Sequence, residues 1–161
     1  MTPRARALAP LFFFAILAIL ALAALAVASD GPAPDFSSWL EDAEGMLEAA
    51  RRFEQEARPM FVYFYTDWCP YCRQFERDLL SADLVEDYID GIVAVRVNPE
   101  NGPAEAEISR RYGVQGFPML FMLSPGSKTW SRVERIELKD GRPVLKQPGA
   151  FVDTLKQASA R

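Results

Sequence analysis

The chain has 161 residues, half of them hydrophobic, and carries a formal net charge of −4. This length suits one domain of ordinary size plus a short additional segment, so a single packed core is expected. There is no histidine and no basic patch interleaved with aromatic residues, which argues against nucleic-acid binding and against metal chemistry based on imidazole ligands.

The first feature along the chain is an apolar segment from Ala7 to Ser29, which contains no charged side chain. As a helix it would extend roughly 35 Å, enough to cross a hydrocarbon core about 30 Å thick. Arg4 and Arg6 precede it, and no other basic residue follows until Arg51. Because cationic flanks stay on the cytoplasmic side, we expect the rest of the chain to be translocated.

Two interpretations of this segment remain open. Small residues at alternate positions near its end match the pattern that signal peptidase accepts, whereas the apolar run is longer than most signal peptides require. Residues 1–28 are therefore predicted to be a signal peptide or an N-terminal membrane anchor. Residues 29–34 contain two prolines and are predicted to be a linker, and residues 35–161 are predicted to form the domain.

The predicted domain opens with a helix and a strand. Apolar residues from Phe36 to Phe53 recur at intervals of three and four, which predicts an amphipathic helix. Ser38 and Glu41 fit a capping box at its start. The run from Met60 to Thr66 is apolar, aromatic and of strand length, so we expect a strand buried on both faces.

The remaining segments continue this alternation. Helices are predicted over 70–80, 82–88, 104–112 and 150–158, and strands over 92–97, 119–123 and 129–138. Asp140-Gly141 is a turn signal before a further strand near Val144 and Leu145. The order predicts an α/β fold in which a mixed central sheet is covered by helices on both faces.

The chain has two cysteines, Cys69 and Cys72, where the strand over 60–66 runs into the next helix. Cys69 would occupy the helix entrance, where free backbone N–H groups and the helix dipole stabilise a thiolate, and Pro70 suits the first helical position. A stabilised thiolate attacks disulfides efficiently, so we expect Cys69 to be the nucleophile. We expect Cys72 to be less exposed and to act second.

A structural disulfide and a zinc site are the alternatives to a redox role for this pair. A four-residue ring constrains the unfolded chain far less than a long-range bridge would. A zinc site normally needs four ligands, mostly cysteine and histidine, and this chain offers two. We therefore expect redox chemistry that requires no metal and no cofactor.

The apolar strand before Thr66-Asp67-Trp68-Cys69-Pro70-Tyr71-Cys72, together with Gly116-Phe117-Pro118 before a later strand, resembles the thioredoxin superfamily. The resemblance covers roughly residues 35–158. It is strongest to exported thioredoxin-like domains, including the C-terminal domain of the transmembrane disulfide reductase of Gram-negative bacteria, while the cysteine tetrad is similar to that of glutaredoxins. It implies a thioredoxin-like fold and disulfide exchange with protein cysteines.

The resemblance also implies the residues that bind substrate. The bond between Phe117 and Pro118 is expected to be cis and to lie beside the sulfurs. The backbone at Phe117 would then pair with an extended segment of the substrate. Trp68, Pro70 and Tyr71 are expected to form the surface around the sulfurs, whereas the other two tryptophans are expected to be packing residues.

The sequence departs from the thioredoxin pattern at Tyr63. Thioredoxins usually carry a buried aspartate six residues before the first cysteine, which helps to move protons, and Tyr63 occupies that place here. No side-chain base is evident for Cys72, so water is the alternative carrier of the proton. Asp67 is expected to point to solvent, because a carboxylate beside a thiolate opposes its formation.

The sequence therefore predicts a monomeric thiol:disulfide oxidoreductase in the bacterial periplasm, either soluble after cleavage or anchored to the inner membrane through residues 7–29. Its expected partners are protein thiols or disulfides and a redox partner protein. Two alternatives remain open: a glutathione-linked, glutaredoxin-like enzyme, and a binding module of thioredoxin fold without turnover. Against the first, glutathione is mainly cytosolic, and no basic cluster near Pro118 is evident to hold its carboxylates.

Overall fold

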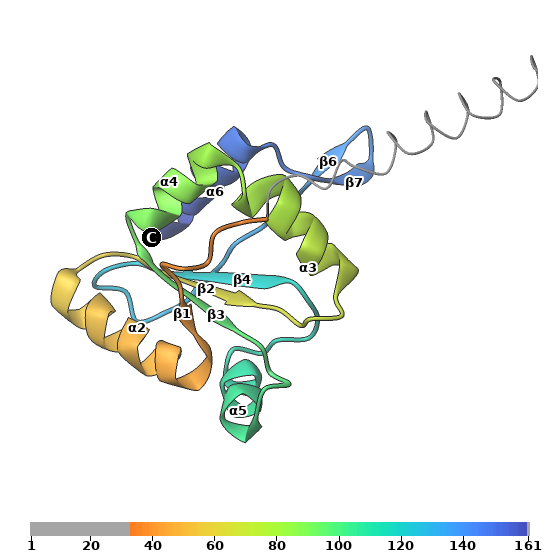
Figure 1. The fold of residues 1–161 in the computed structure, drawn as a ribbon. Helices are drawn as coiled ribbons and strands as arrows, with labels where there is room; N and C mark the ends of the chain where they lie inside the picture. The colour runs from red at the N-terminus through yellow and green to blue at the C-terminus, as the bar shows by residue number, and fades with distance from the viewer. Residues whose placement is uncertain (1–32, 161) are drawn as a thin grey trace, which may run out of the picture. The chain divides into compact units, whose positions relative to one another are not determined.

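The computed structural model of this protein describes residues 33–160 (Figure 1). The predicted signal peptide or anchor over residues 1–28, and most of the predicted linker, lie outside these residues. Among the residues that are described, no helix is both long enough and apolar enough to cross a membrane.

The domain is built around a five-stranded sheet with the strand order β1-β3-β2-β4-β5. Its strands are β1 (Leu40–Glu41), β2 (Met60–Phe64), β3 (Val93–Val97), β4 (Met119–Leu123) and β5 (Ser131–Arg132). β1 and β2 run parallel to β3, whereas β4 runs antiparallel to β2 and β5 runs antiparallel to β4. The predicted mixed sheet is therefore confirmed.

Helices cover both faces of this sheet, as predicted. They are α2 (Asp42–Glu56), α3 (Pro70–Phe75), α4 (Asp83–Asp90), α5 (Pro103–Arg111) and α6 (Pro148–Ser159). In Figure 1, α2 and α5 lie on one side of the sheet, and α3, α4 and α6 lie on the other. A π-helical turn, η1 (Glu76–Leu80), follows α3 directly.

Successive residues of β2 join two separate hydrophobic cores, because neighbouring side chains of a strand point to opposite faces. Phe61 and Tyr63 belong to the core that α3, α4 and α6 cover, whereas Val62 and Phe64 belong to the core that α2 and α5 cover. All five residues of β2 are buried. The end of β2, where the cysteine pair follows, is thus held by packing on both faces.

The first helix begins later than the apolar spacing predicts. Residues 36–41 form a turn and the short strand β1, in which Leu40 pairs with β3, and α2 begins at Asp42. The predicted capping box is wrong: the Ser38 hydroxyl donates to Asp90 at 3.2 Å, and the N-cap residue of α2, Glu41, makes no side-chain bond to the helix. The backbone N–H of Ala43 in the first turn donates instead to Oε1 of Glu105 at 3.1 Å. The spacing misleads because the aromatic residues of the turn pack on one core and the helix packs on the other.

The segment predicted as one strand over 129–138 forms two strands. After β5 the chain turns inward at Val133, which is buried, and then forms β6 (Ile136–Lys139). β6 pairs with β7 (Arg142–Leu145) in a separate two-stranded sheet. The turn of this hairpin is Asp140-Gly141, whose φ angles of 53° and 74° are those that a tight two-residue turn requires. The predicted turn and last strand are therefore confirmed.

Candidate active site

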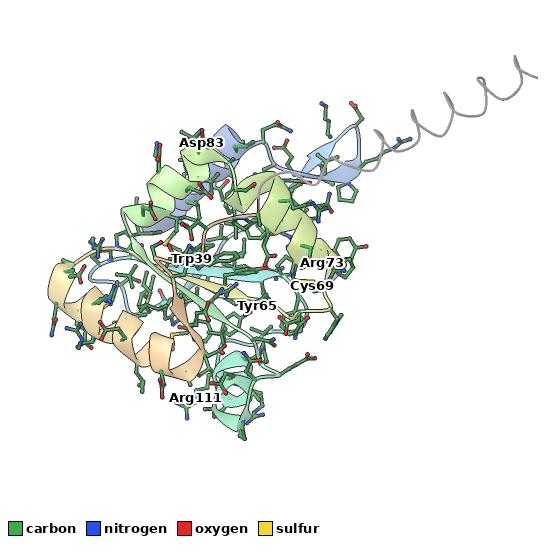
Figure 2. All side chains as sticks on the ribbon, in the orientation of Figure 1. Trp39, Tyr65, Cys69, Arg73, Asp83 and Arg111 are labelled. Atoms are coloured by element: carbon green, nitrogen blue, oxygen red, sulfur yellow. A yellow bond between two sulfur atoms is a disulfide. The ribbon has the colours of Figure 1, made fainter. Side chains whose placement is uncertain are left out.

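Cys69 lies between β2 and α3, and Arg73 lies further along the helix (Figure 2). Cys72 lies in the first turn of α3. Cys69 is the N-cap of α3, and its Sγ accepts a hydrogen bond from the backbone N–H of Cys72 at 3.1 Å. The two sulfurs form a disulfide, with the Cα atoms 5.2 Å apart. In the reduced form the same N–H would stabilise a thiolate on Cys69.

Both cysteines are buried, with 2% of Cys69 and 1% of Cys72 exposed. The expected difference in exposure between the two is therefore not seen in the disulfide form. The neighbouring aromatic side chains are open to solvent instead, with 62% of Trp68 and 66% of Tyr71 exposed. Together with Pro70, which is also exposed, they form an aromatic rim around a covered disulfide.

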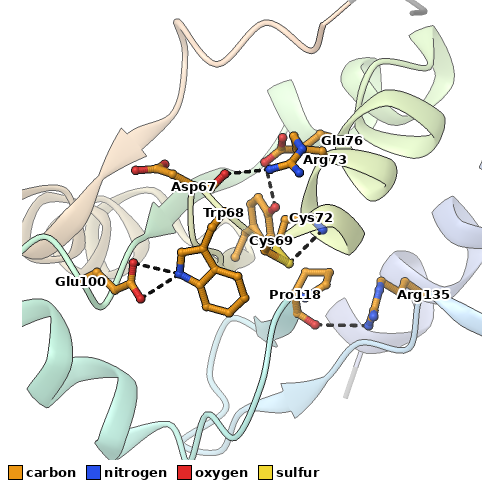
Figure 3. Close-up of a disulfide and its surroundings, with 10 residues drawn as sticks. Asp67, Trp68, Cys69, Cys72, Arg73, Glu76, Glu100, Pro118 and Arg135 are labelled. Atoms are coloured by element: carbon orange, nitrogen blue, oxygen red, sulfur yellow. Dashed lines mark hydrogen bonds between the residues drawn. A yellow bond between two sulfur atoms is a disulfide. The ribbon is translucent and has the colours of Figure 1, made fainter.

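Trp68 is held in place by two neighbours. Its Nε1 donates to the carboxylate oxygens of Glu100 at 2.9 and 3.1 Å (Figure 3). Its ring packs edge-on against Phe117 with the ring centroids 6.3 Å apart. The predicted exposure of this tryptophan is confirmed, whereas Glu100 had no signal in the sequence. Trp39 and Trp130 pack against aromatic neighbours, as predicted.

The loop before β4 brings Pro118 to the cysteine pair (Figure 3). The peptide bond between Phe117 and Pro118 is cis, as the resemblance implies. Phe117 is half-buried and packs against both cores. The structure therefore gathers the predicted substrate-binding residues of the loop and of the tetrad around one disulfide, although the two segments are far apart in the sequence.

A phenol from β2 and a carboxyl group at the end of α3 form a hydrogen-bonded pair. Tyr63 is fully buried in β2, and its hydroxyl donates to Oε1 of Glu76 at 2.8 Å. The backbone N–H of Glu76 bonds to the Cys72 carbonyl, so Glu76 lies one helical turn beyond that cysteine. Burial raises the pKa of Glu76, while the Tyr63 hydrogen bond and the charges of Arg96 and Arg73 oppose the shift. Burial also raises the pKa of Tyr63, which therefore remains a donor.

The sequence showed no side-chain base for Cys72, and Glu76 is a half-buried carboxyl group near that cysteine which this interpretation did not consider. The sequence carried a signal that was missed, because a residue four positions after Cys72 in a helix lies on the same face. The hydrogen bond between Tyr63 and Glu76 had no such signal, since it depends on how α3 packs over β2. Glu76 also begins the π-helical turn, a distortion that is frequent at functional sites.

Two arginines line a hollow next to Pro118. The walls of the hollow are residues 115–119 together with Arg132 and Arg135. Nη1 of Arg135 donates to the Pro118 carbonyl at 3.2 Å. The expectation that no basic cluster lies near Pro118 is therefore wrong, because the arginines come from β5 and the loop after it rather than from the sequence around the proline.

The described part of the chain shows no metal centre at this site. Within residues 33–160, no three His, Cys, Asp or Glu side chains are grouped closely enough to hold a metal ion. Asp67 is exposed, as expected, and its backbone carbonyl accepts a hydrogen bond from Arg73 at 2.9 Å.

Comparison with known proteins agrees with this geometry. Residues 38–125 match the Thioredoxin-like family model. The thiol:disulfide interchange protein DsbD 1 of Pseudomonas aeruginosa is 30% identical over 78 residues, which are 48% of this chain and 13% of that protein. The thioredoxin-like protein HCF164 of Arabidopsis thaliana is 28% identical over 103 residues, 63% of this chain and 38% of that protein. The chain thus spans a minor part of the length of these relatives.

Solved structures show the same fold. The solution structure of a thioredoxin from Thermus thermophilus matches with a TM-score of 0.55 and 30% identity, over 74% of this chain and 86% of that one. The oxidised C-terminal domain of DsbD from Neisseria meningitidis matches with a TM-score of 0.56 and 20% identity, over 74% of this chain and 98% of that one. The predicted thioredoxin-like fold is confirmed.

Proposed function

Since this chain belongs to the Thioredoxin-like family and carries the cysteine pair of a thiol:disulfide oxidoreductase, we propose that it exchanges disulfides with protein cysteines outside the cytoplasm. The observation that carries the proposal is the buried disulfide at the entrance of α3, beside Pro118 and within an exposed aromatic rim. A purely structural bridge has no need of such a rim.

The exchange uses two successive displacements. In the reducing direction, the Cys69 thiolate attacks one sulfur of a substrate disulfide, so that a mixed disulfide forms and one substrate thiolate leaves. The Cys72 thiolate then attacks Sγ of Cys69, which releases the second substrate thiolate and closes the disulfide of the domain. Two electrons and two protons pass from the dithiol to the substrate, and a redox partner protein with its own dithiol restores the reduced pair.

The substrate would bind across the loop of Phe117 and Pro118. An extended segment that pairs with the Phe117 backbone by strand addition would bring its cysteine to Cys69. Trp68 and Tyr71 would cover the segment on either side, since both are exposed and border the disulfide. Such contacts supply apolar area with little loss of side-chain freedom.

Glu76 is the group that would take the proton from Cys72. Its pKa is raised by burial, so it is a stronger base than an exposed carboxylate, and Tyr63 fixes its position by the 2.8 Å hydrogen bond. It lies one turn from Cys72 on the same helix. The Cys72 thiol would therefore lose its proton to Glu76 as it attacks the mixed disulfide.

The proposed location depends on the apolar segment from Ala7 to Ser29 and the two arginines before it. The segment would place the domain in the periplasm of a bacterium, free after cleavage or held at the inner membrane. There the domain would act as a monomer on protein thiols or disulfides. Amino-terminal sequencing of the mature protein from a membrane and a periplasmic fraction distinguishes the two forms.

The proposed activity is tested with two serine variants. Cys69→Ser should reduce insulin disulfides at the uncatalysed rate, because no thiolate is left to attack. Cys72→Ser should form the mixed disulfide and hold it, so that a substrate protein is recovered covalently attached on a non-reducing gel. Unfolding curves of both variants, compared with that of the reduced wild-type chain, show whether each has kept its fold.

A wild-type chain that cannot cycle between dithiol and disulfide would contradict the proposal. The binding module without turnover would be supported if Cys69→Ser retained the cellular phenotype of the wild-type chain. Efficient turnover only with glutathione as the reductant would support the glutaredoxin-like alternative instead.

A further inference from the structure

Arg135 lies at the edge of the active site, in the loop between β5 and β6. Its side chain lines the hollow beside Pro118 and a second hollow between Tyr71 and the β6–β7 hairpin. Figure 3 shows it reaching toward Pro118 from the side opposite Trp68. The residue therefore faces any segment that binds across the cis-proline loop.

The guanidinium of Arg135 has unused hydrogen-bonding capacity. An arginine carries five N–H donors, and within the described residues Arg135 forms one side-chain hydrogen bond, from Nη1 to the Pro118 carbonyl at 3.2 Å. Within residues 33–160 it forms no ion pair with a carboxylate. The nearest acidic residue in sequence, Glu134, is paired with Nε of Arg132 at 3.1 Å.

Burial makes this unpaired charge costly. Arg135 is half-buried, and loss of hydration lowers the pKa of its guanidinium, although the charge of Glu134 partly offsets the shift. A half-buried charge without a partner is destabilised relative to one in water, and a bound carboxylate would relieve that cost. Arginine suits this role because its planar fork matches the two oxygens of a carboxylate.

The surrounding segment is also basic in a chain that is acidic as a whole. Residues 128–146 carry six basic and three acidic side chains, whereas the full chain has a net charge of −4. The basic residues are Lys128, Arg132, Arg135, Lys139, Arg142 and Lys146. An acidic segment of a substrate would therefore be attracted to this side of the active site rather than to the rest of the domain.

We propose that Arg135, assisted by Arg132, forms a carboxylate subsite beside Pro118 that favours substrates with an acidic side chain next to the reacting cysteine. The proposal rests on the function proposed above, since it concerns how the same site selects its substrates. Phe117 and both arginines line the same hollow, so an extended segment paired with the Phe117 backbone would bring the residue that flanks its cysteine to that hollow.

The test compares two model peptides with one disulfide each, identical except for glutamate or glutamine beside the cysteine. The full chain, in its reduced form, should reduce the glutamate peptide with a kcat/KM about fivefold to tenfold higher, as expected for a charge pair at a half-buried site. Arg135→Gln should bring the ratio close to one, and Arg132→Gln should lower it partly. Arg51→Gln, in α2 and outside this basic segment, is the matched control and should leave the ratio unchanged.

A fourth variant keeps both arginines and is expected to change the ratio of the two peptides in the opposite direction. Glu134→Gln removes the carboxylate that pairs with Arg132, so it should raise the preference for the glutamate peptide. This variant and Arg132→Gln leave the Arg135 bond to Pro118 in place. These two variants therefore test the subsite even if Arg135→Gln displaces the loop and slows the reduction of both peptides.

Each outcome bears on the proposal in a defined way. Equal rates for the two peptides in the wild-type chain, or a ratio that Arg135→Gln and Arg132→Gln both leave unchanged, would overturn the subsite. Failure to reduce either peptide would instead overturn the proposed function. In a second arm with glutathione disulfide, an arginine dependence confined to that substrate would show that the bound carboxylate is that of glutathione, and would overturn the assignment to an acidic peptide.

Discussion

The pKa of Glu76 is set by effects that act in opposite directions. Packing over β2 removes water from its carboxyl group, whereas the Tyr63 hydroxyl and the arginine charges stabilise the ionised form. Burial prevails, so the pKa of Glu76 is raised. The folded chain therefore binds this proton more readily than the unfolded chain does, and the ionised group opposes folding at neutral pH.

Glu76→Gln is accordingly expected to stabilise the oxidised domain near neutral pH. The gain should be below about 1 kcal/mol, because the side chain is only half-buried, and should shrink as the pH falls through the raised pKa of Glu76. Urea unfolding at about pH 7 and about pH 4 measures it. The same variant should slow resolution of the mixed disulfide by about tenfold or more, which stopped-flow mixing with a substrate disulfide measures.

Glu107→Gln is the control for this prediction. Arg111 and Arg110 lower the pKa of the exposed Glu107 carboxyl, so its ionised form favours folding above its ordinary pKa. The glutamine variant should therefore lose stability near neutral pH and should leave the resolution rate unchanged. A gain in stability in both variants, or a slower resolution in both, would contradict the role assigned to Glu76.

The residues of the site differ in how far the sequence reveals them. Cys69, Cys72 and Trp68 could be predicted because their spacing and their place between strand and helix are local properties. Glu76 had a local signal in its helical spacing from Cys72. Arg135 could not be predicted, since its contact with Pro118 exists only because the chain turns inward after β5.

Among the elements, α2 packs closely on β1, and the closest approach is at Gly45. A Cβ added at Gly45 would lie 2.8 Å from the backbone carbonyl carbon of Leu40, whereas one added at Gly149 of α6 would lie 3.9 Å from Leu84. Alanine is favoured over glycine within a helix by about 1 kcal/mol. A change from glycine to alanine is therefore expected to stabilise the helix at Gly149. At Gly45 the same gain is opposed by a clash with the backbone.

The two alanine variants should thus change stability in opposite directions. Gly149→Ala should raise the free energy of unfolding by up to about 1 kcal/mol, and Gly45→Ala should lower it by about 1 to 3 kcal/mol. Guanidinium unfolding of the two variants beside the wild-type chain checks both values. If Gly45→Ala were also stabilising, that result would contradict the inference that α2 and β1 lie too close for a side chain at Gly45.

The elements that the sequence failed to define are those whose form depends on distant partners. The strands over 60–64, 93–97 and 119–123 were predictable, because each is a run of strand length in which apolar residues predominate. β1 has two residues and exists through its pairing with β3. Nothing in the spacing of residues 36–41 marks that pairing, so the segment resembled the first turns of a helix.

At the scale of the molecule, the core side chains within the described part of the chain come from residues 36–158. A chain that begins at Ala33 is therefore expected to unfold cooperatively and to reduce insulin disulfides at the rate of the full chain. A chain that begins at Asp42 lacks β1 and two aromatic residues of the turn, and it should lose about 3 kcal/mol or more. Circular dichroism during urea unfolding measures both.

The two truncations test different statements. A chain from Ala33 that shows no cooperative transition would mean that the domain needs the residues before it. A chain from Asp42 as stable as the longer one would mean that Phe36 and Trp39 contribute nothing to the core against which they pack.

Among the strands of residues 33–160, β6 and β7 pair with each other and with no third strand, and this gives the protein a part that can change on its own. Mutations in strands that share no partners usually have additive effects on stability. Residues of the hairpin other than Leu145, which packs against the core that α3, α4 and α6 cover, can therefore accumulate changes of length and charge while the two cores stay as they are. In evolution or in the laboratory, exchange of this hairpin offers a way to change which proteins bind to the domain without changing the rest of the domain.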